Sequence, residues 1–189
     1  SHYIGGDFTI PYGKTLSLSR SNSLMILKMY PSVDISVSGT LSISGVGGTE
    51  YSVTLRANDT SQKWSGLTIN SGGSLSISNT IMKIQKATTG LSLYSANITK
   101  SGEHVNEISD CDCGIYIYGC SPTVQWTKVL NNTNDAVEVS GYAPVLQQTR
   151  LTAGGNGISV SSGYTPVLQQ SKIESVGLEC IYLGYCASV

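Results

Sequence analysis

Apolar residues recur at every second position along most of this chain, and the residues between them are mostly serine, threonine or aspartate. Residues 33–37 (Val-Asp-Ile-Ser-Val) and 74–78 (Ser-Leu-Ser-Ile-Ser) show the pattern. Alternation with a period of two is typical of β-strands that bury one face. Pairs such as Ser-Gly and Gly-Gly separate the runs, and no connection is long enough for a helix. The pattern therefore predicts an all-β chain.

The second half of the chain repeats one short unit. Gly-Tyr-x-Pro-Val-Leu-Gln-Gln occupies residues 141–148 and recurs at 163–170, an offset of 22 residues. A related unit at 119–126 has Cys120 in place of the tyrosine and Trp126 in place of the second glutamine. A repeat this short cannot bury an apolar face alone, so it must stack on its neighbours.

Alignment of the repeats predicts columns of equivalent positions. The first apolar residues lie 21 to 24 residues apart and are Leu67, Leu91, Ile115, Val137, Ile158 and Ile181. A second column, expected to face the interior, contains Ile81, Val105, Val129, Leu151 and Ile173. The residues just before these, expected to face outward, are Thr80, His104, Lys128, Arg150 and Lys172. This spacing fits a three-faced coil of short parallel strands, each coil rising about 4.8 Å.

Three N-terminal segments and the later Gly-Ile-x-Val units carry a family resemblance. The segments are residues 11–16 (Pro-Tyr-Gly-Lys-Thr-Leu), 35–41 (Ile-Ser-Val-Ser-Gly-Thr-Leu) and 63–69 (Lys-Trp-Ser-Gly-Leu-Thr-Ile). They resemble the right-handed parallel β-helix proteins of the pectin-lyase-like superfamily, and within it bacterial secreted and cell-surface repeat modules. The resemblance implies a right-handed parallel β-helix, a β-solenoid of about 7–8 coils with roughly 21–26 residues per coil. That superfamily contains lyases, hydrolases, adhesins and inert spacers, so the fold alone gives no activity.

The domain organisation is predicted to be simple. Residues 1–6, including His2, are interpreted as a tail, either vector-derived or N-terminal, and residues 7–189 as a single β-helix domain. The sequence stops partway into a coil, and a bare coil end is an exposed strand edge. We therefore expect a fragment of, or module in, a longer chain, with further coils or domains at the C-terminal end.

Composition and charge exclude some classes of partner and favour one cellular location. The formal net charge is -1, and eleven scattered lysines and arginines argue against a nucleic-acid partner. No apolar run approaches the roughly 18 residues needed for membrane insertion. Low charge, many hydroxyl side chains and three glycosylation sequons at 58–60, 97–99 and 131–133 favour an extracellular or cell-surface protein.

An acidic corner is the candidate catalytic or metal site. Its members are Asp110, Asp112, Asp135 and Glu138, which stacking would bring within roughly 5–10 Å of one another. Two such carboxylates would serve as acid and base on a glycosidic bond. Alternatively, Asp110, Asp112, Asn134 and Asp135 would bind Ca²⁺, or the corner residues would simply bond their own turn backbone.

The motifs of the polygalacturonase-like members argue against transferring their activity to this chain. Those members carry Asn-Thr-Asp, Asp-Asp, Gly-His-Gly and Arg-Ile-Lys motifs. Residues 132–134 here read Asn-Thr-Asn and residues 155–157 read Gly-Asn-Gly, so an acid and the histidine are missing from the corresponding positions.

Tyrosines carry the binding hypothesis, because the chain has eleven of them against one phenylalanine. Tyr94 and Tyr118 share a coil position with Tyr116 beside them, Tyr142 and Tyr164 form a second pair, and Trp126 lies in the adjoining coil. Such rings would stack on sugars, or they would only stabilise neighbouring coils. The basic column of Lys128, Arg150 and Lys172 would bind an acidic or sulfated glycan, or its side chains would splay apart in solvent.

Cysteine positions argue against disulfides within the chain. Cys113 and Cys120 bracket one strand, and Cys180 and Cys186 bracket the equivalent strand three coils away. Either separation exceeds the reach of a disulfide, so we expect mostly free thiols, with Cys186 available to a partner outside this sequence.

Together these observations favour a non-catalytic, secreted β-helix module. It would bind carbohydrate through its tyrosine-bearing face, or act as an adhesive or structural spacer in a cell-surface protein. No cofactor is expected beyond the calcium hypothesis. The alternative is an enzyme, a polysaccharide lyase or glycoside hydrolase that uses the acidic corner of Asp110, Asp112, Asp135 and Glu138.

Overall fold

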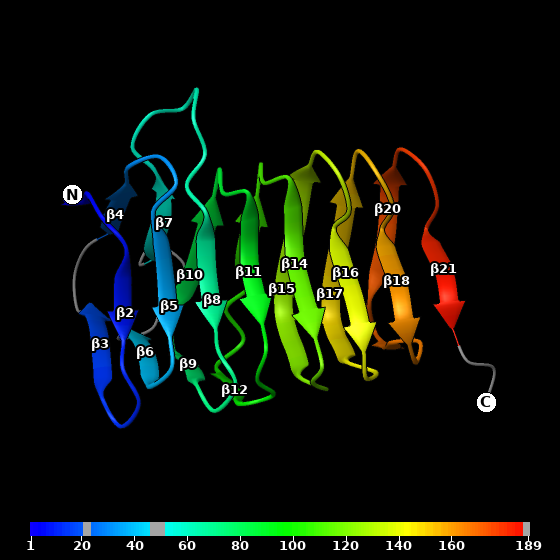
Figure 1. The fold of residues 1–189 in the computed structure, drawn as a ribbon, viewed down its shortest axis with the longest axis horizontal. Coiled ribbons are helices and arrows are strands. Elements are labelled where there is room, and N and C mark those ends of the chain that lie inside the picture. The colour runs from blue at the N-terminus through cyan, green and yellow to red at the C-terminus, as the bar shows by residue number, and fades with distance from the viewer. Residues whose placement is uncertain (21–23, 46–51, 187–189) are drawn as a thin grey trace.

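The computed structural model of the chain is a solenoid of stacked parallel strands, which confirms the predicted parallel β-helix (Figure 1). It describes residues 1–20, 24–45 and 52–186. The N-terminus lies at one end of the solenoid, and β21, the last described strand, lies at the other (Figure 1). Over these three ranges, no helix is long and apolar enough to cross a membrane.

Sheet B is a parallel sheet of eight strands and forms the front layer in Figure 1. In spatial order its strands are β2 (Phe8–Ile10), β5 (Asp34–Val37), β8 (Gly66–Ile69), β11 (Thr89–Leu93), β14 (Cys113–Tyr118), β16 (Val137–Gly141), β18 (Ile158–Gly163) and β21 (Ile181–Cys186). Its register pairs Leu67 with Leu91 and Leu91 with Ile115, and it continues in step to Ile181. The predicted first column is therefore confirmed.

Sheet A contains nine strands and lies behind sheet B in Figure 1. Its strands are β1 (His2–Ile4), β4 (Met25–Met29), β7 (Ser52–Ala57), β10 (Ile81–Gln85), β13 (Asn106–Ser109), β15 (Thr123–Asn132), β17 (Val145–Ala153), β19 (Val167–Gln169) and β20 (Lys172–Val176). Strand β1 pairs with β4, His2 opposite Leu27. The prediction that residues 1–6 are a tail outside the fold is therefore wrong for residues 2–4, because these residues form a strand that pairs with β4 at the edge of sheet A.

Sheet C closes the third side of the early coils only. Its four strands are β3 (Thr15–Arg20), β6 (Thr40–Gly45), β9 (Ser74–Ser78) and β12 (Ile98–Ser101). In later coils the long strands β15 and β17 bend instead, at Trp126 (φ 49°) and Gln148 (φ 52°). Trp126 shares the coil position of Gln148, as predicted, because the residues on either side of the two are paired in register.

The interior column of sheet A differs from the predicted one in its first two members. Ile84 pairs with Ile108, and Ile108 pairs with Val129, so Ile81 and Val105 are not part of the column. Both choices give a 24-residue spacing in the earlier coil. The coil from Ile108 to Val129 shortens to 21 residues after the last strand of sheet C, and sequence periodicity does not reveal where this shortening falls.

Gly114 and Gly157, each followed by an isoleucine, are required by contact between sheets. A Cβ added to Gly114 would lie 2.2 Å from Cγ1 of Val129, and one added to Gly157 would lie 2.2 Å from Cγ2 of Ile173. Side chains of the sheet A column therefore fill the space that a side chain would need at Gly114 in β14 and at Gly157 just before β18.

The corrected column makes a stability prediction. Ile108→Ala should lower the free energy of unfolding by about 2–5 kcal/mol, because Ile108 is 0% exposed and its truncation leaves a cavity. Val105→Ala should cost clearly less, because Val105 is only partly buried and lies before β13. Urea unfolding of the two variants measures the difference, and an equal or larger loss at Val105 would contradict this register.

Candidate functional site

Three tyrosines form a ring cluster on the outer face of sheet B. Tyr116 and Tyr118 alternate with the buried Ile115 and Ile117 along β14, so both point outward. Their ring centroids are 6.3 Å apart, and Tyr94, the residue directly after β11, lies 6.2 Å from Tyr116 and 5.8 Å from Tyr118. Tyr94, Tyr118 and Tyr116 are neighbours, as predicted, but the ring of Tyr94 is tilted by 51° to that of Tyr118 and meets that of Tyr116 edge-on, so Tyr94 does not stack. Tyr94 and Tyr118 keep 39% and 51% of their surface exposed, so the cluster is accessible.

Short polar side chains surround this cluster. Tyr116 is flanked in register by Ser92 on β11 and Glu138 on β16, and Tyr118 pairs with Ser140. Ser140 in turn lies 2.9 Å from Ser162, oxygen to oxygen. The surface made by Tyr94, Tyr116, Tyr118 and Glu138, with these serines, is called the tyrosine face below. It joins aromatic rings to hydroxyl and carboxylate groups on neighbouring strands of one sheet.

Glu138 is the acid of the tyrosine face. Burial raises the pKa of its carboxyl above the ordinary value, and the nearby Asp135 raises that pKa further. Asp135 itself is held in the turn: its Oδ1 accepts hydrogen bonds from the backbone N–H of Asn156 at 2.8 Å and from Asn156 Nδ2 at 3.0 Å. Asn156 Oδ1 then accepts from the backbone N–H of Glu179, 3.2 Å away. Asp135 thus bonds the backbone of the next coil.

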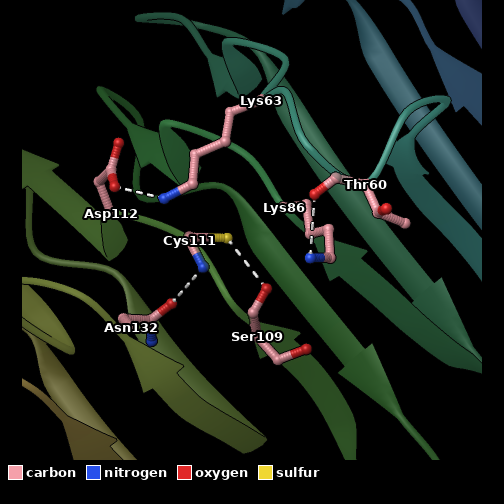
Figure 2. Close-up of polar contacts among 7 residues, drawn as sticks. All are labelled: Thr60, Lys63, Lys86, Ser109, Cys111, Asp112 and Asn132. Carbon is pink, nitrogen blue, oxygen red and sulfur yellow. Dashed lines mark hydrogen bonds and ion pairs between the residues drawn. The ribbon is translucent and has the colours of Figure 1, made fainter.

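The two other acids of the predicted corner have different surroundings. Asp112 forms an ion pair with Lys63, which reaches it from the loop between β7 and β8 (Figure 2). Asp110 has a left-handed backbone (φ 58°) and an exposed side chain. The acidic corner is therefore divided: Asp135 and Glu138 interact, while Asp112 is paired with a lysine that the sequence did not suggest.

A buried asparagine supports the same turn from inside. Asn132 Oδ1 accepts a hydrogen bond from the backbone N–H of Cys111 at 3.0 Å (Figure 2). Its Nδ2 is buried, and it has no hydrogen-bond partner within the described ranges. Ala153 occupies the equivalent position of the next coil, so no side-chain acceptor follows Asn132 there.

The thiols of the cysteines near the acids are not reactive nucleophiles. Burial raises the pKa of the Cys111 thiol to about 11 and that of the Cys113 thiol to about 12, where Glu138 and Asp135 add to the effect. Both thiols are therefore protonated at neutral pH and are weak nucleophiles. Cys111, Cys113, Cys120 and Cys180 are free, as predicted, and the side chain of Cys186 lies outside the described part.

The basic column lies on another face of the solenoid. Lys128, Arg150 and Lys172 are paired in register on the outside of sheet A, as predicted. The prediction that His104 extends this column is wrong, because Glu107 is the residue opposite Lys128. The sequence also missed Glu174, which forms ion pairs with Arg150 and, at 2.7 Å, with Lys172.

The predicted ligand-binding residues therefore do not form one site. Tyr94, Tyr116 and Tyr118 gather on sheet B, whereas the cations gather on sheet A. Tyr142 and Tyr164 are exposed in the turns after β16 and β18, and Trp126 lies at the bend of β15. Glu107 and Glu174 could not be placed beside the basic column from the sequence, because that placement requires the register between coils to be known to the single residue. Lys63 was missed because it lies 49 residues before Asp112, two coils earlier, in a loop that is not part of the repeat.

No metal centre emerges from the described residues: within them, no three His, Cys, Asp or Glu side chains are placed to hold an ion. Calcium binding by Asp110, Asp112, Asn134 and Asp135 stays a prediction, with Asp112 engaged by Lys63 and Asp135 by Asn156.

The environment of Glu138 predicts a pH dependence. Because its pKa is higher in the folded than in the unfolded chain, ionisation of Glu138 opposes folding; this penalty appears as pH rises through the ordinary glutamate range and persists above the raised pKa. The stability of Glu138→Gln relative to the unchanged protein should therefore increase from about pH 3 to about pH 7. Urea unfolding across this range measures it, with Glu103→Gln in the exposed loop before β13 as the control. A difference that stays constant or falls with pH would contradict the assignment.

Comparison with known proteins supports the fold and is silent on activity. The family model described as the right-handed beta helix region matches residues 41–189. Neither a curated protein nor a solved structure matches the chain significantly. The match covers most of the chain and agrees with the parallel stacking of its sheets. The chain belongs to the right-handed β-helix family.

Proposed function

We propose that this chain is a non-catalytic, extracellular β-helix module that binds a carbohydrate through the tyrosine face. The observation that carries the proposal is the accessible cluster of Tyr94, Tyr116 and Tyr118, whose centroids lie within 6.3 Å of one another. An exposed group of three aromatic rings costs hydration free energy that a ligand with apolar faces recovers. Sugar rings have such faces together with hydroxyl groups at their edges.

The polar residues of the tyrosine face suit those hydroxyl groups. Ser92 and Ser140 have hydroxyls that both donate and accept, and Glu138 offers a carboxyl beside Tyr116. The surface is an open sheet, so it favours a chain that lies across it over a small molecule enclosed in a pocket. A polysaccharide or a cell-surface glycan is the ligand class that fits.

An extracellular location fits the positions of the sequons. The side chains of Asn97 and Asn131 are exposed, so two of the three sequons are accessible to modification. The thiols of Cys111 and Cys113 have raised pKa values, so they remain protonated at neutral pH and resist oxidation. An adhesive or spacer role in a larger surface protein is compatible with the same rigid module.

A glycoside hydrolase or lyase is the second candidate, and one observation favours it. Glu138 has a raised pKa, as a general acid needs, and stands beside the rings that would hold the sugar. The opposing observation is that Asp135, its nearest acid, is held by two hydrogen bonds from Asn156. The non-catalytic reading is therefore preferred.

Loss of the rings should weaken glycan binding without unfolding the protein. Tyr94→Ala combined with Tyr118→Ala should raise Kd for the bound glycan about tenfold or more, since two aromatic contacts are removed. A glycan array identifies the ligand, and titration calorimetry measures Kd. Tyr142→Ala with Tyr164→Ala is the matched control, because this exposed pair lies in turns outside the cluster. Unchanged binding in the Tyr94/Tyr118 variant, with a Tm like that of the control, would refute the tyrosine face.

Release of reducing ends in the same samples separates the two candidates. Binding without release supports the module. Release that Glu138→Gln or Asp135→Asn abolishes would establish the enzyme instead, and would show the acidic pair to be catalytic. Absence of binding to every glycan would leave the spacer role.

A further inference from the structure

The outer face of sheet A gathers six of the chain's eleven lysines and arginines, although the net charge of the chain is -1. The six are Lys28, Arg56, Lys83, Lys128, Arg150 and Lys172, from strands β4, β7, β10, β15, β17 and β20. We propose that this surface, called the basic face, is a second binding site, which takes an acidic polysaccharide laid along the solenoid axis.

Strand alternation directs these side chains outward. Lys28 stands between the buried Leu27 and Met29, and Lys128 between the buried Thr127 and Val129. The same alternation holds for the other members, so all six charges lie on one side of one sheet. Because β4 and β20 lie near opposite ends of sheet A, the basic face runs along most of the solenoid.

Carboxylates neutralise only part of this face. Glu107 lies in register between Lys83 and Lys128, and Glu174 pairs with Arg150 and Lys172. Among the described residues of this face, six cations against these two acids leave four positive charges. In the described part of the chain, no ion pair involves Lys28, Arg56, Lys83 or Lys128. Lys28 instead lies over the ring of Tyr3, 5.2 Å from its centroid.

Stacking makes this arrangement unfavourable in the absence of a ligand. Lys28 and Arg56 are opposite each other on neighbouring strands, as are Lys128 and Arg150, and such positions are about 4.8 Å apart. Like charges directly opposite one another destabilise a sheet. A neutral side chain such as Gln85, which occupies the same column as Arg56, would avoid this cost. A bound polyanion relieves it at each pair.

The geometry favours a polysaccharide over a nucleic acid. The coil rise spaces the cations by about 4.8 Å or multiples of it. Duplex DNA carries one charge per about 1.7 Å of its axis, a far denser array on a grooved cylinder. A linear glycan with a sulfate or carboxylate on each sugar or each second sugar is more sparsely charged, and an extended chain lies flat on a sheet. Sulfate and carboxylate share the chemistry that lysine and arginine recognise, so the ligand is defined as an acidic polysaccharide.

Heparin and polygalacturonate are the probes, one sulfated and one carboxylated, with duplex DNA as a third. The full chain should bind at least one of the two glycans with an affinity that falls as salt is raised. Lys83→Gln combined with Lys128→Gln removes two unpaired cations of the face, and should raise Kd about tenfold and reduce the salt slope by about one to two. Lys14→Gln with Lys86→Gln is the matched control, because it removes the same charge from the turn before β3 and from the corner where Lys86 donates to the Thr60 carbonyl.

Each outcome of the comparison bears on the basic face. A selective loss in the Lys83/Lys128 variant, with a Tm like that of the control, supports it, and the tighter glycan identifies sulfate or carboxylate as the preferred group. An equal loss in the control would reduce the effect to net charge and overturn the site, as would failure of both glycans to bind at low salt. Tighter binding of duplex DNA than of either glycan would also overturn it. Tyr94→Ala with Tyr118→Ala should leave heparin and polygalacturonate binding unchanged, which separates this site from the tyrosine face.

Discussion

Backbone hydrogen bonding between stacked coils is the constraint on which the rest of the structure depends. Each strand pairs in parallel with the strand one coil away, so residues at the same coil position form a column with a spacing of about 4.8 Å. Most columns inside the solenoid are apolar and closely packed, as in Ile84, Ile108 and Val129. Even the glycines follow from this packing, since Val129 occupies the space where a side chain of Gly114 would stand.

On the outer surface of the solenoid, the same strand pairing places side chains of equivalent coil positions next to one another in rows, called arrays here. Some arrays only hold coils together: Gln125 Nε2 donates to Gln147 Oε1 at 2.6 Å, and Asp135 and Asn156 each bond the backbone of the following coil. The repeated Pro-Val-Leu-Gln-Gln unit is explained by such stacking. Positions where neighbouring coils depart from repetition are the better candidates for function. Tyr116 is one of them, since its register partners are Ser92 and Glu138.

Two arrays give the molecule two chemically different faces. The tyrosine face on sheet B joins aromatic rings to hydroxyls and one carboxyl, whereas the basic face on sheet A carries unpaired cations. Because the two sheets are different sides of one solenoid, the two proposed sites do not overlap. Each proposed site is therefore separately testable by substitution.

The sequence by itself determined the solenoid and much of its register, because periods of two and of about 22 residues report backbone geometry directly. It placed Leu67, Leu91 and Ile115 in one column and Tyr94 beside Tyr118, both of which the structure has. Contacts that change when the register shifts by a few residues were decided only by the tertiary structure. The shortened coil after β12 moved Ile108 into the interior in place of Val105, and it put Glu107 rather than His104 beside Lys128. Likewise, the pairing of Lys63 with Asp112 depends on the path of a loop, which no repeat specifies, and it divides the acids that the sequence had grouped together.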